Sequence, residues 1–177
     1  MKRIGWVGLV AMAAALAACS SISTNSDYNP GTDFSKYKTW AWHETGSIKD
    51  SLWKQRVRSG VAAELGKKGL TESESGPDLW VAAHTRLDEQ TQINTYNTGW
   101  GYGWGWYGGG MGMTTSTVQQ IPVGTLIVDL VDAKQKELVW RGTATKTLNP
   151  DASPETKQKN LQEALAKMFA SYPPKKQ

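Results

Sequence analysis

The chain has 177 residues, of which 39% are hydrophobic, 20% are charged and 10% are aromatic, and its formal net charge at pH 7 is +4. A chain of this length can build one domain with its own hydrophobic core. The sequence has no block of Lys and Arg of the kind that binds nucleic acids, and its single cysteine excludes an intramolecular disulfide.

The single cysteine ends a segment typical of a bacterial lipoprotein signal. Lys2 and Arg3 precede a short apolar run, and the sequence Leu-Ala-Ala-Cys ends at Cys19. We expect residues 1–18 to be removed as a signal peptide and Cys19 to carry three acyl chains that anchor the protein in a membrane. The apolar run is shorter than the roughly 20 residues that a transmembrane helix needs. Ser20, in place of an Asp after the cysteine, favours the outer membrane.

The mature chain divides into a tether, one domain and a tail. Removing residues 1–18 leaves 159 residues and a net charge of +2, because two of the 20 Lys and Arg residues lie in the signal and 16 Asp and Glu remain. Residues 19–30 are polar and lack apolar periodicity, which predicts a lipidated N-terminus and flexible tether. We expect residues 31–174 to form the domain and residues 175–177 a basic tail.

The first half of the domain is predicted to contain a strand, a helix and a long strand. Residues 34–43 are rich in aromatic side chains and indicate a strand. Ser47 is expected to cap a helix that ends at Gly69, which can adopt a left-handed conformation. Residues 78–93 alternate between apolar and polar side chains, as in a strand with one buried face. The helix has an apolar stripe with a spacing of four residues: Trp53, Val57, Val61 and Leu65.

The second half is predicted to contain three strands and a final helix. Residues 114–121 indicate a weaker strand that ends near Pro122, and residues 125–131 and 138–147 indicate two strong strands joined by a hairpin loop. Ser153 is expected to cap the last helix. Its apolar stripe consists of Leu161, Leu165, Met168 and Tyr172.

The hairpin register predicts one cross-strand ion pair. Pairing Leu130 with Trp140 places both side chains in the core, and the same register puts Asp129 opposite Arg141 on the outer face. Two amphipathic helices and long hairpins together predict a two-layer α+β domain. We expect a mainly antiparallel sheet of about five strands with both helices packed on one face, in the order β-α-β-β-β-β-α.

Four segments of the chain resemble the bacterial lipoproteins of domain-of-unknown-function family 4136. They are DYNPGTDFSKYKTWAW, VRSGVAAELGKKGL, PDLWVAAHT and GTLIVDLVDAKQKELVWRGTAT. The resemblance extends from Asp27 to Pro173 and is most specific in the last segment. It implies a small α+β envelope domain, often behind a lipobox. The family brings no accepted activity, so no catalytic residue can be carried over.

Residues 97–113 form a low-complexity segment, in which glycines and aromatic residues alternate strictly from Gly99 to Trp106. If the segment is extended, the aromatic side chains fall on one face and the glycines on the other. Such an aromatic face could stack on sugar rings, meet a lipid interface or dock a protein. The alternative is a mobile hairpin tip between the flanking strands. The predicted interaction surface consists of Trp100, Tyr102, Trp104, Trp106 and Tyr107.

The charged residues and histidines of the chain give only weak indications of a metal site or an anion-binding site. A zinc site needs about four ligands, but only His84, Asp88 and Glu89 lie close together, and strand alternation separates Glu89 from the other two. A solvated surface is therefore favoured over a metal site. Arg86 and His84 could share the outer sheet face with the predicted ion pair, where a charged cluster could bind an anion or an acidic partner. Ordinary cross-strand pairing is the alternative.

The sequence contains no G-x-S-x-G elbow, Walker loop or H-E-x-x-H motif, and acylation would remove Cys19 as a nucleophile. We therefore predict a non-enzymatic, cofactor-free binding or scaffolding protein, anchored in the outer membrane through Cys19 and facing the periplasm. Its expected partner is an envelope protein or a glycan, not a nucleic acid. One alternative is a glycan- or peptidoglycan-binding module that uses the Gly/aromatic segment. Another is an unrecognised hydrolase with His84 in a pocket beside a carboxylate.

Overall fold

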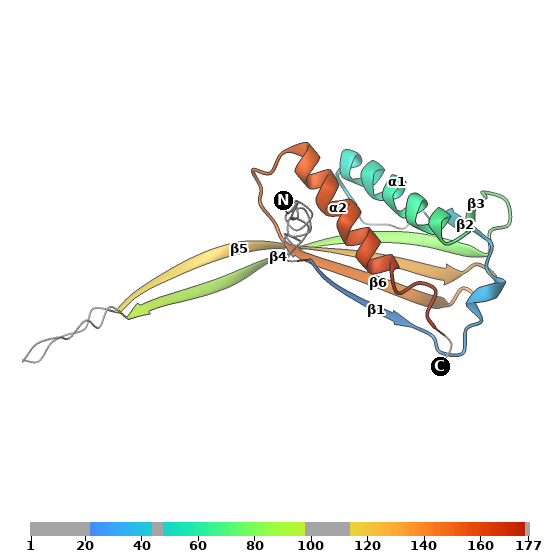
Figure 1. Ribbon diagram of the computed structural model, residues 1–177, viewed down its shortest axis with the longest axis horizontal. Coiled ribbons are helices and arrows are strands. Elements are labelled where there is room, and N and C mark those ends of the chain that lie inside the picture. The colour runs from blue at the N-terminus through green and yellow to red at the C-terminus, as the bar shows by residue number, and fades with distance from the viewer. Residues whose placement is uncertain (1–21, 44–47, 98–113, 176–177) are drawn as a thin grey trace, which may run out of the picture.

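The computed structural model describes residues 22–43, 48–97 and 114–175, with the backbone alone described for residues 92–97 and 114–120. A sheet forms one layer of the domain and two helices form the other (Figure 1). The six strands are hydrogen-bonded in the order β1-β6-β5-β4-β2-β3. The elements are β1 (Ser23–Tyr28), a 3₁₀ turn η1 (Phe34–Lys36), β2 (Thr39–Trp42), α1 (Ser51–Lys67), β3 (Thr71–Glu72), β4 (Leu79–Asn97), β5 (Thr114–Asp132), β6 (Leu138–Thr147) and α2 (Pro154–Phe169).

The α+β class and the placement of both helices on one face are confirmed, but the sheet differs from the prediction in two respects. It has six strands instead of about five. It is also mixed, because β2 runs parallel to both β3 and β4. The parallel pairing follows from the connection between β2 and β4, which passes through α1, because a crossover of this kind returns the chain in the same direction.

The prediction of a flexible tether over residues 19–30 is wrong for residues 23–28, which form β1. This strand pairs antiparallel with β6 at the edge of the sheet, from Ser23 opposite Thr145 to Tyr28 opposite Trp140. Its side chains are mostly exposed, so the segment lacks the apolar alternation that would have identified it as a strand. Ile22, just before β1, is only 8% exposed and belongs to the core.

The predicted strand over residues 34–43 is correct only for its second part. Asp33 caps η1 by accepting a hydrogen bond from the Ser35 backbone amide, and β2 begins three residues after η1 ends. In β2, Trp40 points into the core and is 1% exposed, and Trp42 lies half-buried at the margin of the core. Their indole rings meet edge to face, with centroids 5.6 Å apart. Both tryptophans therefore face the helices.

The two helices begin and end close to the predicted positions. The N-cap of α1 is Asp50, whose side chain accepts a hydrogen bond from the Trp53 amide. The predicted cap, Ser47, lies outside the described residues. At the other end of α1, Gly69 has a φ of +81° and the Leu70 amide donates to Leu65, as the capping pattern predicted.

A continuous β5 replaces the two strands predicted on either side of Pro122. Pro122 lies opposite Glu89 of β4, and its carbonyl accepts a hydrogen bond from the Leu148 amide, just beyond the end of β6. Because the amide and the carbonyl of a strand residue face the same neighbour, the absent N–H of proline faces the side on which β6 ends. Proline is therefore tolerated here without ending the strand.

The core lies between the helices and one face of the sheet. Trp140 stacks against Phe169 of α2 with ring centroids 5.1 Å apart, and Tyr172 packs edge-on against Trp140. The predicted apolar stripes of both helices point into this layer. Their buried residues are Val57, Val61, Leu65, Leu161, Leu165, Met168 and Tyr172.

β4 and β5 continue past the body of the domain as a two-stranded ribbon. Among the described strands, β6 pairs with β5 only as far as Val123, and β2 pairs with β4 only as far as Val81. Within the described strands, residues 89–97 and 114–122 therefore have only each other as strand partners. We call these two segments the ribbon. Figure 1 shows the ribbon projecting away from the two helices.

Candidate binding surfaces

The sheet face opposite the helices presents the ion pair that the hairpin register predicted. Arg141 of β6 donates from Nε to Asp129 Oδ1 at 2.6 Å and from Nη2 to Asp129 Oδ2 at 2.7 Å. The two residues are cross-strand partners on β5 and β6. Asp129 is only 6% exposed although it lies on the outer face. A bidentate pair of this kind fixes both side chains in one geometry.

Two further side chains border the Asp129–Arg141 pair. Asp27 of β1 is the cross-strand partner of Arg141 on its other side. The hydrogen bonds that Arg141 donates to Asp129, together with the negative charges of Asp129 and Asp27, raise the pKa of Arg141. On β4, His84 Nε2 lies 3.9 Å from Asp129 Oδ2. The strands thus place alternating charges across the outer face, and the carboxylate of Asp129 is already occupied by a guanidinium.

Arg86 does not join this group. It lies two residues along β4 from His84 and pairs with Asp88 at 2.8 Å, in a largely exposed contact. Exposed pairs of this kind contribute little to stability. The cluster predicted on the outer face therefore consists of Asp129, Arg141 and His84, and Arg86 forms a separate pair.

A shallow hollow lies on the outer face, on the side of the sheet away from β1. It is lined by His43, Trp80, Ala82, Val131 and Lys136 and has a volume of about 420 Å³. The His43 and Trp80 rings meet edge to face with centroids 5.7 Å apart and form its aromatic wall. His84 is not among the lining residues. The hollow has the size of a small-ligand site, but its walls carry few polar groups.

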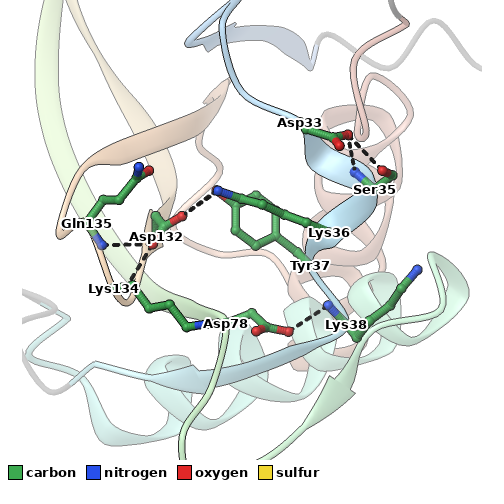
Figure 2. Close-up of polar contacts among 9 residues, drawn as sticks. All are labelled: Asp33, Ser35, Lys36, Tyr37, Lys38, Asp78, Asp132, Lys134 and Gln135. Carbon is green, nitrogen blue, oxygen red and sulfur yellow. Dashed lines mark hydrogen bonds and ion pairs between the residues drawn. The ribbon is translucent and has the colours of Figure 1, made fainter.

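A second polar cluster, shown in Figure 2, closes the end of the sheet where β5 turns into β6. The carboxylate of Asp132 accepts four hydrogen bonds and is 3% exposed. Lys36 Nζ and Tyr37 Oη donate to Oδ2 at 3.0 and 2.9 Å. The backbone amides of Lys134 and Gln135 donate to Oδ1, each at 2.9 Å. Asp132 therefore holds the hairpin loop and η1 together.

The titration of this cluster follows from its geometry. Burial disfavours the Asp132 carboxylate, but the hydrogen bonds from Gln135, Lys36, Tyr37 and Lys134 outweigh burial and hold its pKa well below the usual range. Burial, reinforced by the hydrogen bond to Asp132, raises the pKa of Tyr37 to about 12. The hydrogen bond that Lys36 itself donates to Asp132 raises the pKa of Lys36. Asp132 is therefore charged and Tyr37 is neutral at physiological pH.

Asp78 forms a matching clamp at the start of β4. Its Oδ2 accepts hydrogen bonds from the backbone amides of Lys38 and Thr39 at 2.9 and 3.0 Å and from the Thr39 hydroxyl at 3.1 Å. These amide bonds lower the pKa of Asp78. The carboxylate thus fixes the entry to β2 against the entry to β4.

Sequence reasoning missed the Asp132 cluster, because Lys36 and Asp132 are 96 residues apart. One local signal was present: an Asp at the first position of a hairpin loop commonly accepts hydrogen bonds from the amides two and three residues later. That pattern could have identified Asp132 as a turn residue. It could not have indicated its contacts with η1.

The remaining predicted sites either lie outside the described residues or show no metal-binding group within them. The lipidation site Cys19 and the surface formed by Trp100, Tyr102, Trp104, Trp106 and Tyr107 lie in segments that the structure does not describe. Within the described residues, no group of three or more His, Cys, Asp or Glu side chains could hold a metal ion. In the same part of the chain, no helix has the length and apolar character needed to cross a bilayer.

Several solved structures are similar to this chain at low sequence identity. A PDZ domain protein from Parabacteroides distasonis is 16% identical, with a TM-score of 0.55 over 89% of this chain, which spans only 36% of that protein. The PelC dodecamer from Paraburkholderia phytofirmans is 12% identical, with a TM-score of 0.49 over 84% of this chain and 95% of PelC. Lipoprotein GNA1162 from Neisseria meningitidis is 11% identical, with a TM-score of 0.42 over 76% of this chain and 99% of its own.

The likeness to the Parabacteroides distasonis protein shows a shared fold and nothing finer, and no curated protein matches the sequence. The family comparison is more specific. The model of a domain of unknown function, DUF4136, matches residues 24–174. This range extends from β1 past the end of α2 and so includes nearly all of the described fold. The chain therefore belongs to the DUF4136 family of domains of unknown function.

Proposed function

We propose that this protein is a non-catalytic binding or scaffolding module of the bacterial cell envelope, anchored in the outer membrane by acyl chains on Cys19 and facing the periplasm. The observation that carries the proposal is the ribbon. β4 and β5 leave the body of the domain as a pair, and the chain between Asn97 and Thr114, at the far end of the ribbon, holds the aromatic residues of the predicted interaction surface. Such an arm can present a contact segment at a distance from the core.

The structure near Cys19 supports the anchor. Ile22 is packed into the core and β1 starts at the next residue, so only Ser20 and Ser21 separate Cys19 from the folded domain. A lipid on Cys19 would hold the domain close to the membrane surface. Several acyl chains are sufficient for stable attachment without any spanning helix.

Two buried carboxylates, Asp129 on the outer face and Asp132 at the end of the sheet, support a role without catalysis. Asp129 accepts two hydrogen bonds from Arg141, and Asp132 accepts four. A carboxylate whose oxygens already accept several hydrogen bonds is a poor general base, because its lone pairs are occupied. His84 lies beside Asp129, on a strand of the open sheet face. These carboxylates fit a structural role better than an acid–base pair.

The proposal is tested by crosslinking in intact envelopes followed by affinity purification of the protein. We expect a specific partner to be recovered, and recovery to fall when Trp100, Trp104 and Trp106 are changed together to Ala. The control is Trp80→Ala, which removes an indole from the outer face and leaves the predicted interaction surface intact. Equal recovery by the triple variant and the wild type would refute the role of this segment.

A second candidate function is binding of a glycan such as peptidoglycan. It is favoured by the alternation of Gly and aromatic residues in the sequence and by the aromatic wall of His43 and Trp80 on the outer face, because flat aromatic rings stack on sugar rings. We expect a shift in tryptophan fluorescence during glycan titration and co-sedimentation with insoluble peptidoglycan. Neither effect would be seen if the partner is a protein.

A further inference from the structure

The ribbon and the start of the folded chain lie at the same end of the sheet. Ser23, the first residue of β1, is opposite Thr145 of β6, which is opposite Thr125 of β5, which in turn is opposite Arg86 of β4. The ribbon begins three residues farther along β4, at Glu89. Figure 1 shows β1 starting where the ribbon leaves the body and running away from it. The loop between β5 and β6 lies at the opposite end.

Short distances separate the ribbon from the proposed anchor. Three strand spacings between β1 and β4 amount to about 15 Å. The three peptide units from Cys19 to Ile22 span at most about 11 Å. Because Ile22 is fixed in the core, an acylated Cys19 would hold the base of the ribbon near the membrane surface. The ribbon, nine residue pairs long, extends about 30 Å from that base.

Apart from Glu89 at its base, the ribbon belongs to a long stretch of sequence without charged side chains. From Gln90 to Val128 the chain contains no Asp, Glu, Lys, Arg or His, although 20% of the whole sequence is Asp, Glu, Lys or Arg. Open strand edges are usually protected by charged side chains, Lys above all. Their absence is unfavourable for a ribbon surrounded by water. It is favourable for a ribbon beside a bilayer, because charges near hydrocarbon lose solvation and uncharged polar side chains lose less.

We propose that the ribbon lies along the surface of the bilayer that holds the lipid of Cys19, at the level of the lipid headgroups. This inference rests on the proposed acylation of Cys19. It sets the orientation of the domain: the ribbon and the start of β1 lie at the membrane, and the β5–β6 loop with the Asp132 cluster lies at the end of the sheet farthest from the ribbon. The membrane surface is thus the first contact of the ribbon, and any further partner meets the protein there.

The test uses the full-length acylated protein in phosphatidylethanolamine–phosphatidylglycerol vesicles. Because Cys19 is acylated, a cysteine introduced elsewhere is the only thiol and accepts a single nitroxide label. Thr91→Cys places the label on an exposed position of the ribbon, and Gln135→Cys places it on the exposed loop at the opposite end. The readout is the collision of each label with oxygen, which partitions into lipid, relative to a nickel chelate, which stays in water.

We expect the ratio of oxygen to nickel collisions to be several-fold higher at Thr91→Cys than at Gln135→Cys. Equal ratios, with both proteins floating with the vesicles and Cys19 acylated by mass spectrometry, would overturn the inference and leave the proposed anchor intact. Spin–spin broadening confined to Thr91→Cys, with water-like collisions, would assign the ribbon to a second copy and also overturn it. An unmodified Cys19 would refute both the anchor and the inference.

Discussion

Arg141 and Asp129 form a two-point hydrogen-bonded pair between β6 and β5, at 2.6 and 2.7 Å, with the carboxylate buried and about half of the Arg141 side chain exposed. The asymmetry decides what each partner contributes. Arg141 can return to water if Asp129 is removed. Asp129 has a buried charge that depends on Arg141, so loss of the arginine is the more damaging change.

We therefore predict that Arg141→Met lowers the free energy of unfolding by about 1–3 kcal/mol, because it leaves a buried carboxylate without its main donor. Urea denaturation followed by tryptophan fluorescence measures the change. The matched control is Arg86→Met, which breaks the exposed pair with Asp88 and should cost less than about 1 kcal/mol. Equal losses in the two variants would show that the Asp129–Arg141 pair has no special role.

The lowered pKa of Asp132 predicts that the stability of the fold decreases in acid. Its pKa is lower in the folded state than in the unfolded chain, so its contribution is complete above the unfolded pKa and is lost as the pH falls toward the folded value. We expect Asp132→Asn to reduce stability at neutral pH and to flatten the decline in stability below about pH 4. Thermal unfolding from pH 7 to pH 2 measures both effects.

Asp151→Asn serves as the control for the acid series, since Asp151 is exposed in the loop before α2. This variant should retain the wild-type slope. If Asp132→Asn keeps the same acid slope as the wild type, the four hydrogen bonds to its carboxylate do not control the pH dependence.

Tyr37 gives the corresponding prediction in alkali. Its pKa of about 12 lies above the ordinary value, so the folded state holds the phenol proton more tightly than the unfolded chain. This contribution is complete below the unfolded pKa, near 10, and is lost as the pH rises toward 12. Tyr37→Phe should therefore be less stable at pH 8, by about 1–3 kcal/mol for a hydrogen bond to a charged group, and should lose less stability between pH 9 and pH 11.

Tyr172→Phe separates the hydrogen bond from burial, because burial is the largest cause of the raised pKa of Tyr172. We expect its stability at pH 8 to stay closer to that of the wild type. Chemical denaturation at pH 8, 9, 10 and 11 compares the three proteins. A loss at pH 8 that is equal in both variants would contradict a specific role for the Tyr37–Asp132 hydrogen bond.

The contrast between Asp129 and Asp132 shows what could be predicted from the sequence. The Asp129–Arg141 pair follows from the alternation of two strands joined by a short loop, so the register could be predicted before the structure was known. The Asp132 cluster depends on how η1 packs on the end of the sheet, and nothing in the local sequence specifies a contact between residues 95 or 96 positions apart. Long-range polar contacts of this kind require the tertiary structure.

The edges of the sheet were hard to predict for a related reason. β1 is polar and mostly exposed, and apolar alternation is the signal by which strands are recognised. The buried center of β4, β5 and β6 shows that signal clearly. The strand that was not predicted, β1, and the unexpected continuity of β5 through Pro122 therefore both lie where hydrophobic burial is weakest.

Two glycines test how tightly the helices pack on the sheet. Gly142 of β6 faces α2, and a Cβ built there would lie 2.5 Å from Met168 Cγ and also in contact with Trp140. Gly66 of α1 has open space around its Cβ position. We predict that Gly142→Ala destabilises the domain by about 1–3 kcal/mol, the usual cost of overpacking a core.

Gly66→Ala should instead stabilise the domain by about 0.5–1 kcal/mol, because alanine loses less conformational entropy than glycine in a helix. Urea denaturation at pH 7 measures both variants, and the opposite signs matter more than the magnitudes. A neutral Gly142→Ala variant would mean that α2 can move away from β6 at little cost. The close packing of Met168 and Trp140 would then not be what limits the side chain at position 142.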